Sequence, residues 1–157
     1  MYIKGVDCMT FVFMDQAIDD YNEITKYLKD LTKDKTDCTL HITDNYFTSR
    51  MSIDTVHFDR AKNLICIAGN IKNIIIYSVG YSGNFLADYN RFKTDIELLG
   101  KTVTLVSKNV HGRYWIVDSK GFYMDNSFNN VNTPGKVTII NFLSDDELTD
   151  IKVKMGI

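Results

Sequence analysis

Apolar residues recur along the chain with different periods, and each period predicts a type of element. The run IKGVDCMTFVFM (3–14) is rich in β-branched and aromatic residues, which favours a first strand. From Ile18 to Leu31 apolar residues recur at helical spacing. Asp15 is a suitable N-cap for this helix, because its carboxylate can accept a hydrogen bond from a free backbone N–H group.

A β-like pattern follows the first helix. Turn-forming residues separate four short runs that predict strands: TLHIT (39–43), SIDTVHFD (52–59), LICIAGN (64–70) and NIIIYSVG (73–80). The segment DRAKN (59–63) is expected to connect two of them as a hairpin. The run 74–79 is apolar on both faces, which is typical of a central strand in a sheet covered by helices.

The second half of the chain alternates helices and strands. A buried stripe predicts a helix over 84–99, and Gly100 supplies its left-handed stop. Strands are expected at TVTLVS (102–107), RYWIVD (113–118), GFYMD (121–125) and VTIINFL (137–143). Ser144 and Glu147 form a capping box for a last helix. The sequence therefore predicts an α/β fold, with a mixed, mostly parallel sheet and flanking helices in a single domain, 1–157.

Composition narrows the classes of function. The net charge of -2 argues against the broad basic surface that nucleic-acid domains usually show, although a local basic groove remains compatible with it. The three cysteines form no C-x-x-C pair, so neither a disulfide framework nor a zinc site is indicated. Asp44, Asp54 and Asp59 lack EF-hand spacing and are interpreted as solvated turn and edge acids. No apolar run is long enough to span a membrane, and a cytoplasmic protein is expected.

Candidate chemistry is concentrated in HGRYWIVDSKGFYMDNSFNN (111–130). Alternate residues of an extended chain share a face, so His111 and Arg113 are expected to point the same way. After the hairpin, Ser127 and Asn129 are expected to share a face again and to return beside the histidine. An imidazole, a guanidinium, a hydroxyl and an amide could then surround one small anion, and guanidinium suits phosphate because it donates two parallel hydrogen bonds.

The segments HGRYWIVD (111–118) and NSFN (126–129) resemble the HKD motif of the phospholipase D superfamily. That motif is His, any residue, Lys, four residues and Asp, followed after a short gap by Gly-Ser-x-Asn. The resemblance extends back over the strand, helix and strand from Ile74. This chain departs from the motif in three ways: Arg113 replaces the lysine, Asn126 replaces the glycine, and one extra residue separates Asn126 from Asp118.

The resemblance implies a role for each matching residue. His111 would be the nucleophile that forms a phosphohistidine, without a metal or other cofactor. Arg113 would bind the phosphate in place of lysine, and Asp118 would support the geometry and charge of the site. Ser127 and Asn129 would bind phosphate oxygens or orient the imidazole, with Asn126 beside them.

Further contacts and a second subunit follow from the same resemblance. The loop after the central strand can line the site in this family, so Tyr81 and Ser82 are candidate substrate contacts, although a helix-capping loop explains them equally well. The superfamily needs two motif histidines and this chain carries one, which implies a homodimer. His41 and His57 lack a following basic residue and are interpreted as strand histidines.

Three functions are compatible with these residues. The first is a metal-independent phosphodiesterase that acts on nucleic acid. The second is a catalytically degenerate phospholipase D-like module that binds nucleic acid, a phosphate ligand or a protein partner. The third is an interaction protein with no anion site. The absence of an amphipathic membrane helix counts against a lipid substrate.

Overall fold

A computed structural model describes residues 2–4, 10–15, 20–68, 70–79, 84–131, 133 and 137–157. Its strands form one eight-stranded sheet in the order β1-β2-β8-β7-β6-β3-β4-β5. The strands are β1 (Tyr2–Lys4), β2 (Thr10–Asp15), β3 (Cys38–Thr43), β4 (Ile71–Ser78), β5 (Thr102–Ser107), β6 (Arg113–Val117), β7 (Lys120–Met124) and β8 (Val137–Phe142). The helices are α1 (Asp20–Thr32), α2 (Thr55–Ile67), α3 (Asn84–Leu98), the short 3-10 helix η1 (Phe128–Asn130) and α4 (Asp145–Met155).

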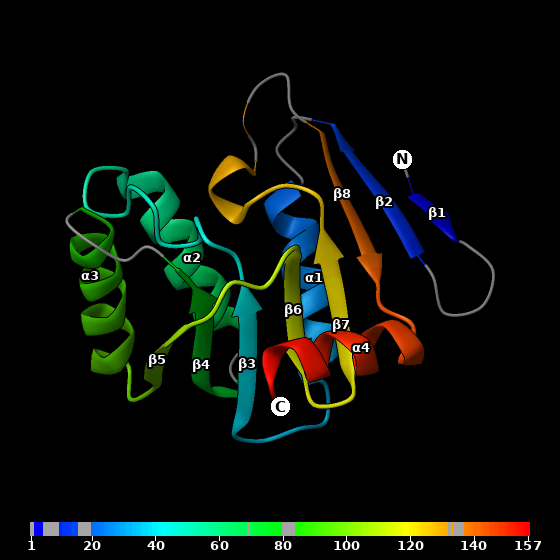
Figure 1. Cartoon of the computed structure of the whole chain (residues 1–157). Coiled ribbons are helices and arrows are strands. Elements are labelled where there is room, and N and C mark those ends of the chain that lie inside the picture. Colours follow the sequence, from blue (N-terminus) through cyan, green and yellow to red (C-terminus); the bar gives the residue numbers. More distant parts are fainter. Residues whose placement is uncertain are drawn as a thin grey trace.

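Two βαβ units build the parallel part of the sheet. Helices α2 and α3 connect β3 to β4 and β4 to β5, and these three strands pair in parallel (Figure 1). The other neighbouring strands pair antiparallel, so that five of the eight strands, β2, β3, β4, β5 and β7, run in one direction. The predicted α/β class is confirmed: helices flank a mixed sheet, which is mostly parallel in that most of its strands run in one direction.

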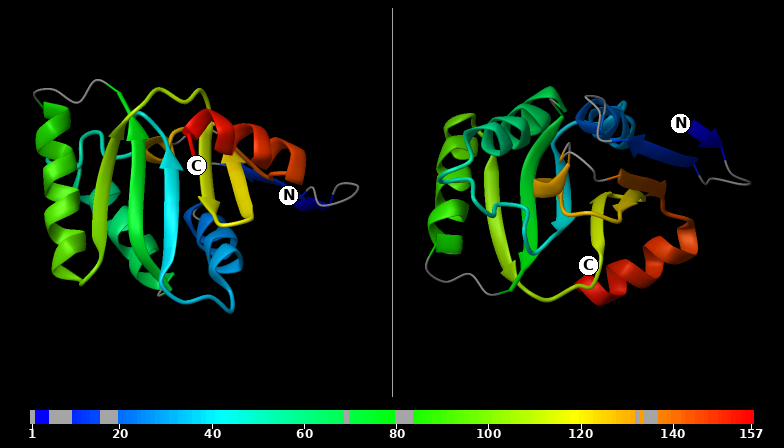
Figure 2. Two further views of the ribbon diagram at one scale, coloured as in Figure 1. Left: turned by 60° about the horizontal axis from the view of Figure 1, so that its bottom comes forward. Right: turned by 90° about the horizontal axis from the view of Figure 1, so that it is seen from above.

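Helices cover both faces of the sheet (Figure 2). The main core lies between one face and α1, α2 and α3, and it contains Trp115, Phe47 and Phe92, all fully buried. Helix α4 packs on the opposite face, where Leu148 and Ile151 belong to a second cluster with residues of β4 and β6. No helix within the described ranges is both long and apolar enough to cross a bilayer.

Helix α2 (Thr55–Ile67) occupies the segment that was expected to form a strand hairpin, so this prediction was wrong. The side chain of Asp54 caps α2 by accepting a hydrogen bond from His57 N at 3.0 Å. Phe58, Ala61 and Leu64 are buried at three-residue spacing, which a strand would distribute over both of its faces. Because α2 occupies this segment, His57 is a helix residue, whereas His41 lies on β3 as predicted.

The N-terminal prediction also needs correction. The segment expected as one strand contains two, β1 and β2, which pair antiparallel. Asp15 is the last residue of β2 and pairs with Val137, so it does not cap α1, which begins at Asp20.

The predictions for α3, β5 and α4 are confirmed. Helix α3 spans Asn84–Leu98, and Gly100 follows it with a φ of 79°. The capping box of α4 is present, since Ser144 and Glu147 each accept a hydrogen bond from the backbone N–H group of the other.

Candidate functional site

His111 lies in the connection between β5 and β6, near the carboxyl ends of the parallel strands. The carboxyl ends of parallel strands are the edge at which open α/β sheets usually bind ligands. The His111 side chain is exposed and makes no hydrogen bond or ion pair within the described residues. It lines a pocket of about 240 Å³ together with Asn45, Tyr46, Asn109, Val110, Gly112 and Arg113.

Gly112 and Thr43 fix the turn that carries His111. The φ of Gly112 is 102°, and a Cβ atom there would lie 2.5 Å from the Tyr114 ring. Thr43 is the last residue of β3 and is fully buried. Its hydroxyl donates to Gly112 O at 3.0 Å and accepts from Tyr114 N at 2.9 Å. The loop is therefore attached to β3 on both sides of the glycine.

Arg113 begins β6 and is half-buried beside His111 in the same pocket. Its Nη1 atom donates to Asp125 O at 3.0 Å. Asp125 is in turn held by β8, because its carboxylate accepts from Ile139 N at 2.8 Å. This hydrogen bond anchors the guanidinium through one of its N–H groups. The remaining N–H groups have no hydrogen-bond acceptor within the described residues and can bind a ligand.

Asp44 connects the loop after β3 to the segment after β7. Its carboxylate is buried and accepts from the Ser127 hydroxyl (2.8 and 2.9 Å), from Phe128 N (2.9 Å) and from Tyr46 N (2.9 Å). Burial raises the pKa of Asp44, while these three donors and the Arg113 charge act in the opposite direction. The expectation that Asp44 is a solvated acid was wrong, whereas Asp54 caps a helix and Asp59 is exposed as expected.

The residues after β7 form a 3-10 helix, so the strand alternation expected for them does not apply. Ser127 is only 1% exposed, and its hydroxyl faces Asp44. Asn129 lies within η1, and its Oδ1 atom is buried without a hydrogen-bond partner among the described residues. Asn126 is half-buried just before η1. Among the proposed phosphate ligands that the structure describes, Arg113 alone therefore lines the pocket with His111.

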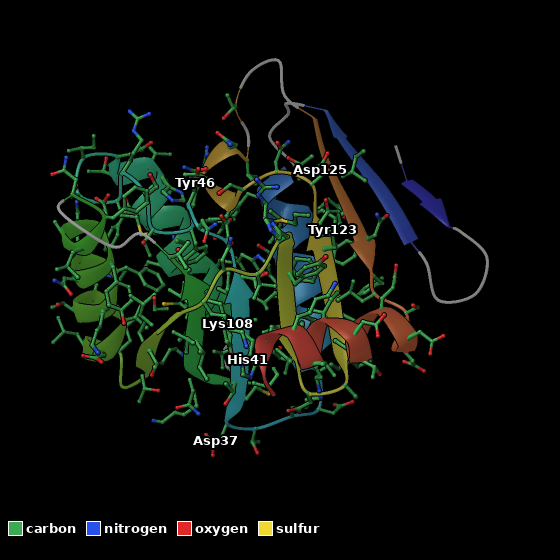
Figure 3. All side chains as sticks on the ribbon, in the orientation of Figure 1. Asp37, His41, Tyr46, Lys108, Tyr123 and Asp125 are labelled. Atoms are coloured by element: carbon green, nitrogen blue, oxygen red, sulfur yellow. The ribbon has the colours of Figure 1, made fainter. Side chains whose placement is uncertain are left out.

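Asp118 is not near His111, contrary to the role expected for it. It lies at the exposed β6–β7 turn with a φ of 52°, and it forms an ion pair with Lys35 at 3.0 Å. Five residues of extended chain, about 16 Å, separate it from Arg113. Lys35 precedes β3, and Figure 3 shows Asp37 at that end of the sheet and Tyr46 and Asp125 at the other. Tyr81 and Ser82 lie outside the described residues.

The other two histidines have local partners. His57 is buried, and its Nε2 atom donates to Phe47 O at 2.8 Å. The Nδ1 atom of His41 is hydrogen-bonded to the Tyr77 hydroxyl at 2.9 Å on the sheet face. Burial lowers the pKa of both histidines. Within the described residues, no three His, Cys, Asp or Glu side chains are grouped to hold a metal ion.

The sequence did not reveal that residues 43–46 help to build the pocket of His111. The pattern that could have indicated this is the Thr-Asp-Asn run at the end of a buried strand, where polar residues commonly form sites in α/β folds. The partner of Asp44 is Ser127, which is 83 residues away, and no local pattern reports such a contact.

The sequence matches no protein-family model and no curated protein. The solved structures that match this chain include the following three. Polyphosphate kinase from Porphyromonas gingivalis matches with a TM-score of 0.52 and 11% identity, over 94% of this chain and 26% of that one. NucT from Helicobacter pylori matches with a TM-score of 0.49 and 16% identity, over 94% of this chain and 92% of that one. TrmBL2, an archaeal chromatin protein, matches with a TM-score of 0.45 and 13% identity, over 97% of this chain and 51% of that one.

The likeness to polyphosphate kinase concerns the fold alone, since identity is low and the chain spans about a quarter of that protein. The fold of this chain is accordingly similar to that of part of polyphosphate kinase.

Proposed function

We propose that this protein is a metal-independent phosphodiesterase that cleaves nucleic acid through a phosphohistidine at His111. The observation that carries this proposal is the exposed imidazole of His111, which has no hydrogen-bond partner in the described part of the chain, beside the anchored guanidinium of Arg113 in one pocket. A neutral imidazole is a nucleophile, and a guanidinium stabilises the charge that develops on the phosphate oxygens. The phospholipase D-like fold supports the same reading.

The reaction has two displacements at phosphorus. A nitrogen of His111 attacks, an N–P bond forms, and the ester P–O bond breaks as the leaving oxygen takes a proton from a second imidazole. Water then attacks phosphorus and gives its proton to that second imidazole, while the N–P bond breaks. The products are an alcohol and a phosphate monoester, and both imidazoles return to their starting states.

The second imidazole is proposed to come from another copy of the chain. His57 is buried on Phe47 O, and His41 is hydrogen-bonded to Tyr77 on the sheet face, so neither is free beside His111. A two-fold axis beside the pocket would instead bring two His111 side chains together in a homodimer.

The remaining motif residues take supporting roles. Asp44 and Ser127 act as positioning residues, because their hydrogen bonds join the loop of Tyr46 to η1. Asn126 lies just before η1 and Asn129 within it, and neither lines the pocket of His111, so their contact with the phosphate stays a prediction. Contacts from Tyr81 and Ser82 stay a prediction. Asp118 has no part in this mechanism, since it pairs with Lys35 at the other end of β6.

Cleavage of labelled oligonucleotides in EDTA tests the proposal. Wild-type activity should survive EDTA, and His111→Ala should abolish it, while His41→Ala serves as a matched control at a histidine outside the pocket. Acid-labile labelling of the wild type by substrate phosphorus should also disappear in His111→Ala. Retained cleavage in His111→Ala would exclude the proposed nucleophile.

Subunit mixing tests the dimer. If each reaction needs two His111 side chains, random mixing of equal amounts of wild type and His111→Ala should leave about a quarter of the activity of the same total amount of wild type. If the activity instead falls only to the wild-type fraction of the mixture, one His111 side chain is enough for each reaction.

A phosphate-binding module without turnover is the second candidate. Two observations favour it: Arg113 already donates to Asp125 O, and Asp118 is not in the pocket. This candidate predicts thermal stabilisation by phosphate or tungstate that Arg113→Ala removes, with no hydrolysis of DNA, RNA or cyclic diesters.

A further inference from the structure

Tyr46 is an exposed aromatic residue on the wall of the His111 pocket. It follows β3 by three residues and leaves 50% of its surface in solvent. The other residues that line this pocket within the described chain include no phenyl, phenol or indole ring. An aromatic ring exposed beside a proposed phosphate site is a surface on which a nucleobase can stack.

We infer that Tyr46 stacks against the base next to the cleaved phosphate, and that the substrate is therefore a nucleic-acid strand with unpaired bases. This inference rests on the proposed function and adds the class of substrate. In a duplex, each base is already paired and stacked on its neighbours, so its face is not available to Tyr46. A single strand offers the face without that cost.

The pocket is small, since its volume of about 240 Å³ lies below the range of roughly 300–1,000 Å³ that encloses drug-sized ligands. A phosphodiester can lie between His111 and Arg113, which both line it. The neighbouring base can then lie against Tyr46, which lines the same pocket and stays half exposed to solvent.

The position of Tyr46 is fixed from both sides. Its backbone N–H group donates to Asp44, the same carboxylate that holds Ser127. Its ring packs at 6.4 Å from the Phe85 ring on α3. The preceding residue, Asn45, accepts hydrogen bonds from the Ser78 hydroxyl and Val79 N at 3.1 and 3.3 Å. A ring held in place loses little freedom when a base stacks on it.

The test compares Tyr46→Ala with the matched control Tyr46→Phe, which keeps a stacking ring. Binding is measured by fluorescence anisotropy in a His111→Ala background, so that it does not depend on turnover. The probes are a labelled single-stranded DNA, an abasic strand of the same length and charge, and the corresponding duplex. Circular dichroism and size-exclusion chromatography monitor the fold and the oligomeric state.

The wild-type surface should bind the single strand more tightly than the abasic strand or the duplex. Tyr46→Ala should weaken binding of the single strand about tenfold and leave the abasic strand unchanged, while Tyr46→Phe stays near wild type. Equal affinity for normal and abasic strands, no effect of Tyr46→Ala, or no binding of any strand would overturn the inference. So would a Tyr46→Ala effect that consists only of dimer dissociation, because Tyr46 would then be an interface residue.

The outcome is separable from that of the proposed function. If no diester is hydrolysed but Tyr46 still distinguishes normal from abasic strands, the nuclease proposal fails and the base-stacking surface stands. If hydrolysis depends on His111 but Tyr46 does not distinguish normal from abasic strands, the nuclease proposal stands and the base-stacking inference fails.

Discussion

At the residue scale, Asp44 has the largest structural role in the site. Its carboxylate satisfies three donors, the Ser127 hydroxyl and the backbone N–H groups of Tyr46 and Phe128. Asp44→Ala leaves these donors buried without a partner, and each such group costs about 1–3 kcal/mol. We expect the free energy of unfolding to fall by about 3 kcal/mol or more, measured by urea denaturation.

Asp44→Asn is the control, because it keeps the shape and one carbonyl oxygen. Its loss of stability should be smaller than that of Asp44→Ala. Equal stability of Asp44→Ala and wild type would mean that the three donors find other partners.

Gly112 is constrained by both its backbone and its surroundings. A side chain there would be strained at a φ of 102° and would also meet the Tyr114 ring. Gly100 offers a matched comparison, since its φ is 79° and a Cβ atom there would meet nothing within 4 Å. Gly100→Ala should cost about 1–2 kcal/mol for its backbone conformation alone. Gly112→Ala should cost more in thermal denaturation and should also weaken phosphate binding; equal costs would contradict the proposed clash.

At the scale of elements, His57 attaches α2 to the loop after β3. Its ring donates to Phe47 O and is buried, which lowers its pKa below the ordinary value of 6.5. The unfolded chain therefore binds a proton more readily than the folded one in the pH range just below 6.5. The contribution of neutral His57 to stability is fully present above pH 6.5 and is lost as the pH falls through the folded pKa.

His57→Gln should remove this dependence while keeping a donor for Phe47 O. The quantity to measure is the difference in unfolding free energy between wild type and variant from pH 7.5 to 4.5, because His41 and Asp44 contribute equally to both proteins. This difference should decline as the pH falls below about 6.5. A difference that stays constant over this range would show that His57 does not titrate with a lowered pKa.

Among the secondary-structure elements, those that depend on local sequence were predicted best. Helix α3 and the capping box of α4 depend on neighbours a few residues apart, and both were predicted. Helix α2 was misread because the β-branched residues Thr55, Val56 and Ile65 favour strands, whereas packing of Phe58 and Leu64 decides the segment. His111 and Arg113 were found from their spacing, but the Asp44–Ser127 contact depends on how distant elements meet.

At the scale of the whole molecule, Trp115 joins the parts of the main core. It is the single tryptophan and is fully buried, and its ring contacts Phe47, Phe122 and Phe128 from three segments. Its fluorescence should therefore report the loss of this joint packing.

If residues 1–157 form the single domain predicted from the sequence, the chain should unfold in one cooperative step. The urea transitions measured by Trp115 fluorescence and by far-ultraviolet circular dichroism should then have the same midpoint and slope. A circular dichroism transition that separates from the fluorescence transition would indicate a part of the chain that unfolds independently of the core.

The pairing of β3 with β6 has a consequence for the order of folding. It joins Thr43 to Tyr114, while the βαβ units pair strands that follow one another in sequence. Contacts across such long separations carry a larger entropy of loop closure and form slowly. The pocket around His111 exists only after this closure, when the β6–β7 hairpin has docked on β3. During refolding, secondary structure should consequently recover before affinity for phosphate does.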